Sequence, residues 1–189
     1  MIRSQGLERK EELVGAAYRQ IAANGFEGLR TRDVADEVGV NVATLHYHFP
    51  TKEDLIRAVV GYTMSRFQAT LAQDGTARER LQGHFRGLRR LSREEPEVFA
   101  VMAELWMRSV RDTSLAKIIG KANDYWFETL RSLIQGARSE GALPKEIEAD
   151  GMAAVVVATL RGAYLLPGRR SPEGIDKVIQ QLERLLGPR

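Results

Sequence analysis

The chain has 189 residues, of which 43% are hydrophobic and 28% are charged, with a formal net charge of +3, a pI near 9.3 and no cysteine. This length accommodates one large or two small helical domains, and the absence of cysteine excludes thiolate zinc sites and thiol catalysis. No apolar run approaches the roughly 18 to 20 residues needed to cross a bilayer, and the opening MIRSQGLERKEE has no apolar signal region, so we expect a cytoplasmic protein.

The beginning of the chain predicts a loose tail over residues 1–7 and a first helix over 8–24. Leu13, Ala17 and Ile21 recur at the four-residue spacing of one helix face. The Asn-Gly pair that follows is suited to end this helix, because glycine tolerates the left-handed conformation of a helix stop.

The segment 31–55 predicts two short helices joined by a tight turn. The first has one apolar face, formed by Val34, Ala35 and Val38. Thr31 is suited to cap its start, and Gly39 is suited to the left-handed stop at its end. Two short helices in this arrangement indicate a helix-turn-helix, which places its second helix in the DNA major groove.

The second short helix is predicted over 42–48, with Asn41 as its N-cap. Phe49 precedes Pro50 and is therefore pushed out of helical geometry, which ends the helix. The residues 51–54 then resemble a capping box that opens a longer helix.

Leu45 and Phe49 are four residues apart and are expected to face inward, which leaves the rest of the second helix for DNA. Small apolar residues and a threonine at its start suit base edges, and the tyrosine, histidine and lysine side chains suit phosphates. The predicted DNA-binding residues are Thr31, Arg32, Val42, Ala43, Thr44, His46, Tyr47, His48 and Lys52.

The run GVNVATLHYHFPTKEDL, residues 39–55, resembles the signature of the tetracycline-repressor (TetR) family, Gly-Val-Ser-x-Gly-Thr-Leu-Tyr-x-His-Phe-x-Ser-Lys-Glu-x-Leu. The positions that match by type and spacing are Gly39, Val40, Thr44, Leu45, His48, Phe49, Lys52, Glu53 and Leu55. Three conservative departures are Asn41, Ala43 and Thr51. The main departure is His46, where the family usually has the tyrosine that contacts phosphate, and Tyr47 beside it could compensate.

The motif resemblance covers roughly residues 9–72 and implies an all-α homodimeric regulator. We expect an N-terminal helix-turn-helix DNA-binding domain over 1–50 and a helical ligand-binding and dimerisation domain over 51–189. The fourth helix, 51–73, is apolar on two faces and would bridge the two domains. About nine helices are expected in total, the later ones over 75–93, from Glu94 onwards, 113–139, 146–166 and 172–186.

The fifth predicted helix is strongly basic. Its arginines are Arg78, Arg80, Arg86, Arg89, Arg90 and Arg93. A solvated face whose side-chain stems cover apolar surface is the preferred interpretation. A site for an acidic ligand, or an accessory contact with DNA, is the alternative.

The last two helices predict association with a second chain, because one is apolar on nearly all sides and the other has a regular apolar stripe. Two such helices from each of two chains would form a four-helix interface, and a two-fold dimer reads two DNA half-sites. The predicted interface residues are Val155, Val156, Thr159, Leu160, Ala163, Ile175, Val178, Ile179, Leu182 and Leu186.

The middle helices mix aromatic and polar residues in the manner of a small-molecule pocket, and the family resemblance implies such a pocket there. The predicted ligand-binding residues are Phe67, His84, Phe85, Leu88, Met102, Trp106, Tyr125, Trp126, Thr129 and Arg161. An inward Glu104 or Glu128 would favour an aromatic-bound cation. An inward Arg161 or His84 would favour an organic acid or acyl ligand.

An enzyme is not expected. His46 and His48 are two residues apart and point in different directions on a helix, which makes a poor metal pair. No serine elbow, HExxH motif or phosphate-cradling glycine loop is present, and no cofactor or metal is predicted. We expect a repressor released from a palindromic operator by a small hydrophobic or amphipathic ligand. The alternatives are a regulator that senses a protein partner, or a transcriptional activator.

Overall fold

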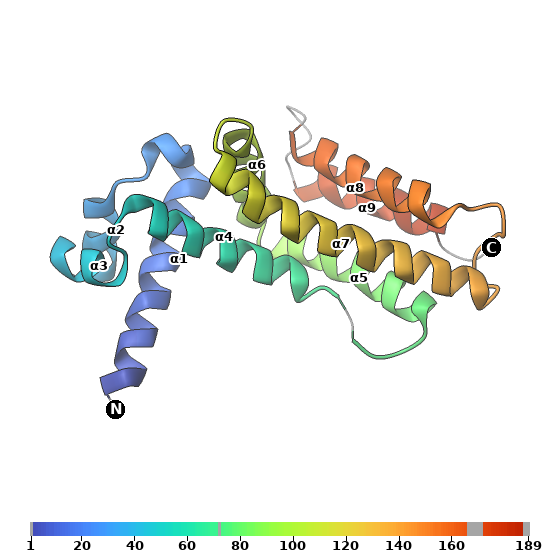
Figure 1. Cartoon of the computed structure of the whole chain (residues 1–189), viewed down its shortest axis with the longest axis horizontal. Coiled ribbons are helices and arrows are strands. Elements are labelled where there is room, and N and C mark those ends of the chain that lie inside the picture. Colours follow the sequence, from blue (N-terminus) through green and yellow to red (C-terminus); the bar gives the residue numbers. More distant parts are fainter. Residues whose placement is uncertain (1, 72, 166–171, 187–189) are drawn as a thin grey trace. The chain divides into compact units, whose positions relative to one another are not determined.

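A computed structural model describes residues 2–71, 73–165 and 172–186, and within these ranges the secondary structure consists of nine helices and no strand (Figure 1). The helices are α1 (Ile2–Gly28), α2 (Thr31–Val38), α3 (Val42–His48), α4 (Lys52–Gln68), α5 (Ala77–Glu94), α6 (Glu97–Ser109), α7 (Thr113–Ser139), α8 (Ala149–Leu165) and α9 (Pro172–Leu186).

Two compact units divide the chain, Met1–Ser65 and Arg66–Arg189. The division falls near the end of α4, whereas the sequence analysis predicts the domain boundary after residue 50. One helix therefore begins in the first unit and ends in the second.

Three predicted helices have the observed bounds, namely α3, α7 and α9. The expected tail is wrong for residues 2–7, because α1 already begins at Ile2. That stretch contains no proline, and a helix extends at little cost once nucleated. The expected break at Gly25 is confirmed by its non-helical φ of 67° and ψ of 178°.

Two predicted helix ends are shifted inward. The helix α4 ends at Gln68 rather than residue 73, because the hydroxyl of Thr70 donates to the carbonyl of Phe67 at 2.6 Å and closes a turn. The helix α8 starts at Ala149 rather than residue 146, with the carboxylate of Glu148 accepting from backbone N–H groups of its first turn. The last residue of its predicted range, 166, lies outside the described residues.

The first unit has a small core in which α1 packs against α2 and α2 against α3. Fully buried members include Leu13, Ile21, Val34, Leu45 and Leu55. Each of these side chains contributes roughly 1.5 to 3 kcal/mol to the stability of the fold when it is removed from water. The core therefore holds α2 and α3 by one buried face each.

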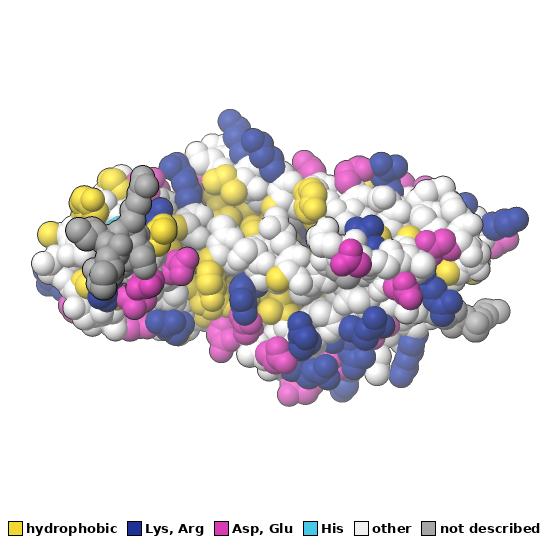
Figure 2. All heavy atoms as spheres, turned by 90° about the horizontal axis from the view of Figure 1, so that it is seen from below, with side chains coloured by type: hydrophobic (Ala, Val, Ile, Leu, Met, Phe, Trp, Pro, Cys, Tyr) yellow, Lys and Arg dark blue, Asp and Glu magenta, His cyan; other side chains and the backbone are white. Residues whose placement is uncertain are grey.

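In the second unit α5 packs against both α7 and α9, while α7 also packs against α6 and α8 (Figure 1). Its fully buried side chains include Phe85, Leu88, Leu105, Ile134 and Leu160. The face in Figure 2 shows cationic and anionic side chains interspersed, with hydrophobic side chains in separate patches. Within the described ranges, no helix has the length and apolar character needed to cross a membrane.

Candidate nucleic-acid interface and effector region

The turn between α2 and α3 has the predicted glycine stop. Gly39 has a φ of 71°, in the left-handed region, and its N–H donates back to the end of α2. The predicted cap at Thr31 is wrong. Thr31 is the first helical residue, and Arg30 occupies the N-cap without a side-chain hydrogen bond.

The helix α3 is held at both ends. The side chain of Asn41 accepts from the backbone N–H of Thr44 at 2.7 Å, which confirms the predicted N-cap. Leu45 and Phe49 are 0% and 2% exposed, as predicted, and anchor the helix in the core. The ammonium of Lys10 lies 5.6 Å from the ring centroid of Phe49, on the α1 side. One face of α3 is therefore fixed and the other is available.

The available face of α3 carries the residues predicted to bind DNA. Tyr47 is 83% exposed, Ala43 and His46 are exposed, and Val42, Thr44 and His48 are half-buried. Arg32 is exposed near the start of α2, while Thr31 and Lys52 are half-buried at the starts of α2 and α4. None of the nine predicted residues is buried in the single chain.

The two hydroxyl groups of α3, on Thr44 and Tyr47, differ in their partners within the chain. The hydroxyl of Thr44 donates to Asn41 Oδ1 at 2.9 Å, so it has an acceptor within the chain. The rings of Tyr47 and His48 meet edge to face at 5.3 Å between centroids. The Tyr47 side chain is 83% exposed, and no hydrogen bond of its hydroxyl is found among the described residues, so of the two it is the one expected to donate to a phosphate.

The start of α4 has the predicted capping box, with aspartate in the fourth position. The Thr51 hydroxyl accepts from the N–H of Asp54 at 3.1 Å, and the carboxylate of Asp54 accepts from the N–H of Thr51 at 3.2 Å. Hydrogen bonding from the Thr51 side chain is the main cause of the lowered pKa of Asp54, and Arg57 adds to it. The cap fixes where the chain turns from α3 into α4.

In the second unit, a chain of hydrogen bonds links α7 to the end of α4 through His84. The Trp126 Nε1–H donates to His84 Nε2 at 2.9 Å. The ring proton is therefore on Nδ1, which donates to Thr70 Oγ1 at 2.8 Å. The Thr70 hydroxyl in turn donates to the Phe67 carbonyl in the last turn of α4. Each polar hydrogen in this chain has an acceptor.

The imidazole of His84 is 1% exposed. Burial lowers its pKa to about 4, because the cation would lose its hydration, while hydrogen bonding to Thr70 acts weakly in the other direction. The ring is therefore neutral at pH 7, as the hydrogen-bond pattern requires.

Other predicted ligand-binding residues lie in two further places. The Cζ of Arg161 lies 5.1 Å from the ring centroid of Trp106, and burial lowers the pKa of Arg161 despite the nearby Asp124. The buried Arg161 Nε has no hydrogen-bond partner among the described residues. Phe67 packs edge to face on Phe99 at 5.3 Å between ring centroids.

The remaining predicted ligand-binding residues divide between core and surface. Phe85, Leu88 and Met102 are at most 5% exposed and belong to the core. Tyr125 and Thr129 line a groove of about 280 Å³ on α7. The groove also includes Glu128, which the sequence offered as a contact for a cation, and Arg80 of the basic helix. The lining residues that sequence reasoning missed are Leu71, Gln73, Ser132 and Leu133. Their convergence depends on the tertiary packing of three segments, for which the sequence holds no local signal.

Most of the predicted dimer residues face inward within the single chain. Those at most 4% exposed are Val156, Leu160, Ala163, Ile175, Ile179, Leu182 and Leu186. They are covered because α9 packs on α5 and α8. The accessible members are Val155, which is 50% exposed, and the half-buried Thr159 and Val178.

Residues 13–59 match the family described as bacterial regulatory proteins, tetR family, and residues 77–186 match the C-terminal domain of BetI-type transcriptional repressors. The chain is 27% identical over 168 residues to the HTH-type transcriptional regulator BetI of Rhizobium meliloti, covering 86% of this chain and 79% of that protein. It is 30% identical over 86 residues to the HTH-type transcriptional repressor KstR2 of Mycolicibacterium smegmatis, covering 43% and 42%. The match to KstR2 thus spans less than half of that relative's length.

Three solved structures share the fold. A TetR transcription regulator from Haloarcula marismortui has a TM-score of 0.84 at 21% identity, over 95% of this chain and 96% of that one. A transcriptional regulator from Saccharomonospora viridis, solved with choline, has a TM-score of 0.76 at 24% identity, over 94% and 96%. AibR, solved with isovaleryl coenzyme A and operator DNA, has a TM-score of 0.73 at 20% identity, over 96% and 100%.

These relatives are named as transcriptional regulators or repressors, which points to a regulator rather than an enzyme. The match of residues 77–186 alone covers more than half of the chain, and the helix-turn-helix lies within the match of residues 13–59. This protein therefore belongs to the TetR family of bacterial transcriptional regulators.

Proposed function

We propose that this protein is a homodimeric repressor that a small amphipathic ligand releases from a palindromic operator. Residues 1–50 would read the DNA, residues 51–189 would bind the ligand and the second subunit, and α4 would link them. The observation that carries the proposal is the two-sided character of α3, whose inner face is fixed by Leu45 and Phe49 while Tyr47 is 83% exposed. A rigid helix with one accessible face is suited to a major groove.

Two substitutions test the DNA interface. Thr44→Ala and Tyr47→Ala are each expected to weaken operator binding by about 1 to 3 kcal/mol, the usual cost of a lost contact, with unchanged thermal unfolding. Binding is measured by fluorescence anisotropy with duplexes from the region flanking the gene. Tyr125→Ala, at a tyrosine that is 56% exposed on α7, is the matched control and should keep wild-type affinity. Unchanged binding by both α3 variants would mean that α3 is not the recognition helix.

A dimer is supported by the short length of DNA that one helix-turn-helix can read. A single recognition helix reads too few base pairs, whereas two related by a two-fold axis read half-sites roughly 34 Å apart. The accessible apolar surface of α8 and α9, with Val155 and Leu185 at 50% and 57% exposed, is the proposed interface.

The groove at Tyr125 and Thr129 is the proposed place of ligand contact. It sets apolar Leu71 and Leu133 beside charged Arg80 and Glu128, which suits an amphipathic molecule. Related folds hold choline in one protein and isovaleryl coenzyme A in another, but a shared fold does not fix the ligand.

Coupling to DNA would run through the His84 hydrogen bonds. Leu71 and Tyr125, which line the groove, are sequence neighbours of Thr70 and Trp126, the two partners of His84. A ligand that moves either partner would disturb the bond from Thr70 to the Phe67 carbonyl in α4. Ligand and operator would then each weaken the binding of the other by the same factor.

The ligand arm is tested with choline and isovaleryl coenzyme A as the first two probes. A probe that binds should lower operator affinity, and Tyr125→Ala should reduce that effect while operator binding without the probe stays unchanged. A bound probe that leaves operator affinity unaltered would contradict the proposed release mechanism. Activation instead of repression would show as increased expression from a reporter that carries the operator.

A protein partner is the second candidate for the sensing role. Met107 and Val110, at the end of α6, are 55% and 84% exposed, and exposed apolar side chains that lie close together are typical of interaction sites. Met107→Gln with Val110→Gln should leave the response to a small-molecule probe unchanged, and should abolish regulation in cells only if a protein is sensed there.

A further inference from the structure

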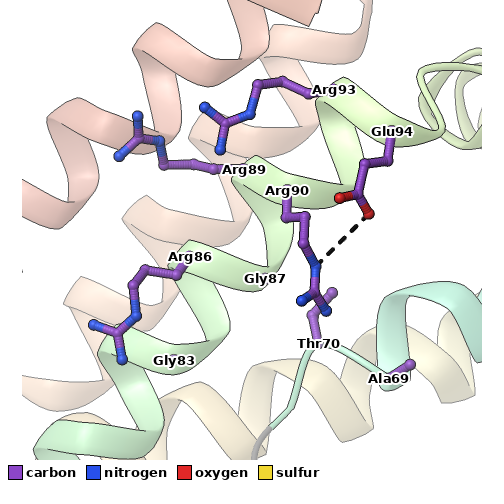
Figure 3. A pocket seen from close by; sticks show the side chains of 9 residues that line it. All are labelled: Ala69, Thr70, Gly83, Arg86, Gly87, Arg89, Arg90, Arg93 and Glu94. Atoms are coloured by element: carbon purple, nitrogen blue, oxygen red, sulfur yellow. Dashed lines mark ion pairs between the residues drawn. The ribbon is translucent and has the colours of Figure 1, made fainter.

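The helix α5 carries four arginines along one face, at the i, i+3, i+4 and i+7 spacing that places side chains together. They are Arg86, Arg89, Arg90 and Arg93, and with Glu94 they line a groove of about 740 Å³ (Figure 3). The rest of the lining is Ala69, Thr70, Gly83 and Gly87. We call this the arginine groove. It is separate from the groove at Tyr125, with which it shares no lining residue.

Only part of the positive charge in the arginine groove is neutralised by the protein. Arg89 is held by Asp176 at 2.8 Å and by Glu183 at 2.9 Å, both from α9. Arg90 reaches Glu94 only at 3.8 Å, and both side chains are more than half exposed. No ion pair of Arg86 is found within the described ranges, and its side chain is exposed. Arg93 likewise reaches Asp176 only at 3.8 Å. The weakly compensated charge therefore lies at Arg86, Arg90 and Arg93, and of these Arg86 and Arg90 flank Gly87.

The surface between these two arginines is formed by Gly87 and by Thr70, which packs on it. A Cβ added at Gly87 would lie 2.9 Å from Thr70 Cβ and 3.2 Å from Thr70 Cα, so the turn that follows α4 rests directly on α5. Figure 3 shows Arg86 and Arg90 extending to either side of Gly87. Two guanidinium groups thus flank the contact of Thr70 with Gly87, and Gly83 adds no side chain to the groove.

We propose that the arginine groove binds a phosphorylated metabolite of nucleotide size. The planar guanidinium donates to phosphate oxygens in pairs, which makes arginine the preferred residue for phosphate recognition. Arg86 and Arg90 are like charges at i, i+4, an arrangement that an anion between them would stabilise. The volume lies within the range of small-molecule sites and far exceeds one phosphate ion. A hollow of this kind fits a compact ligand better than the convex backbone of duplex DNA.

This site goes beyond the function proposed above, because it is a second ligand site whose chemistry does not depend on the first. Thr70 belongs to its wall and also accepts from His84. A phosphorylated ligand in the arginine groove would therefore contact the residue on which the His84 hydrogen bonds converge.

Isothermal titration calorimetry of the full chain tests the proposal with tripolyphosphate, ATP and adenosine. The titrations are run at about 0.1 M salt, where charges more than about 10 Å apart are screened. Tripolyphosphate and ATP should bind, and adenosine, which has the base without the phosphates, should not. Arg86→Gln with Arg90→Gln should weaken both interactions by about tenfold or more, as expected for the loss of charge-assisted hydrogen bonds.

The matched control is Lys117→Gln with Lys121→Gln, which removes two exposed cations at the same i, i+4 spacing on α7. It should retain wild-type affinity for tripolyphosphate. Equal weakening by both double variants would show attraction by net charge alone and would overturn the proposal, as would wild-type protein that binds neither phosphate. Should the arginine double variant unfold, Arg86→Gln alone is used, since its exposed side chain has no ion pair to lose within the described ranges.

A duplex of unrelated sequence separates this proposal from an accessory contact with DNA. The arginine double variant should bind such a duplex with wild-type affinity. ATP should not displace the duplex from the wild-type protein. If the arginine double variant loses affinity for the duplex as it does for tripolyphosphate, the groove is part of a DNA-binding surface and the proposal is wrong. None of these results depends on operator recognition by α3, which the Tyr47→Ala variant tests separately.

Discussion

At the scale of single residues, His84 shows how a polar side chain is tolerated in a core. Its two ring nitrogens form hydrogen bonds with Thr70, which precedes α5 in the sequence, and with Trp126, which follows it. The bond that Nε2 accepts from Trp126 requires the neutral ring, and burial favours that state by lowering the pKa of His84 to about 4. The same arrangement makes the fold sensitive to acid.

The pH dependence of stability should therefore carry a His84 contribution of definite sign. Above pH 6.5 both the folded and the unfolded states are neutral at this residue and the contribution is constant. Between pH 6.5 and 4 only the unfolded state takes up the proton, so stability falls as pH falls, by roughly 3 kcal/mol in total. Urea unfolding at pH 7.5 and pH 5 measures the loss.

His84→Leu should be less stable than the wild type at pH 7.5 by about 1 to 3 kcal/mol, since Thr70 and Trp126 lose a buried partner, and should lose less stability on acidification. His46→Gln removes an exposed histidine of α3 and should retain the wild-type acid loss. An acid loss that persists in full in His84→Leu would assign it to carboxylates instead.

At the scale of elements, α5 joins the helices of the second unit, and one arginine ties it to α9. Hydrogen bonding from Arg89 is the main cause of the lowered pKa of Asp176, and Asp176 is the main cause of the raised pKa of Arg89. The folded-state pKa of Asp176 is below its ordinary value. This pair therefore stabilises the fold above that ordinary value, and the stabilisation is lost as pH falls through the lowered one.

Arg89→Met should destabilise the protein by about 1 to 3 kcal/mol at pH 7, because Asp176 and Glu183 lose their nearest cation and only Arg93 remains, 3.8 Å from Asp176. The neighbouring Arg90→Met is the control and should change stability by less than about 0.5 kcal/mol, since its pair with Glu94 is long and exposed. Denaturant unfolding compares the two. Equal effects would mean that methylene packing, and not the ion pairs, holds α9.

The elements also show what a sequence can and cannot predict. The caps at Asn41 and Thr51 and the stop at Gly39 depend on residues within four positions, and local chemistry predicted them. The early end of α4 was missed because apolar periodicity continues to Leu71, while the hydroxyl of Thr70 closes the helix.

Contacts between residues far apart in the sequence could not be predicted from local sequence patterns. The apolar stripe of α9 correctly indicated a covered face, but periodicity does not say what covers it, and much of the face packs inside the chain. His84 meets a residue 42 positions away and Arg89 one 94 positions away. Neither separation leaves a signal in one sequence, so the His84 chain and the arginine groove required the folded structure.

At the scale of the whole molecule, the proposed function requires a second copy of the chain, and Val155 offers the most direct test of that requirement. It is 50% exposed on α8, next to the buried Val156. Val155→Glu should cost the isolated subunit little, because the carboxylate remains in water. At a dimer interface the same carboxylate would be buried without a partner, so we expect the dimer dissociation constant to rise about 100-fold or more.

Sedimentation velocity over a concentration series measures that constant, and anisotropy with a palindromic duplex and with its single half-site measures the consequence. The variant should lose most of its preference for the palindrome while its weak binding to the half-site is unchanged, because α3 is untouched. Val110→Glu places the same charge at a valine that is 84% exposed beyond α6 and should behave as the wild type. A Val155→Glu protein that still dimerises and still prefers the palindrome would move the interface away from this face of α8, while leaving α3 as the recognition helix.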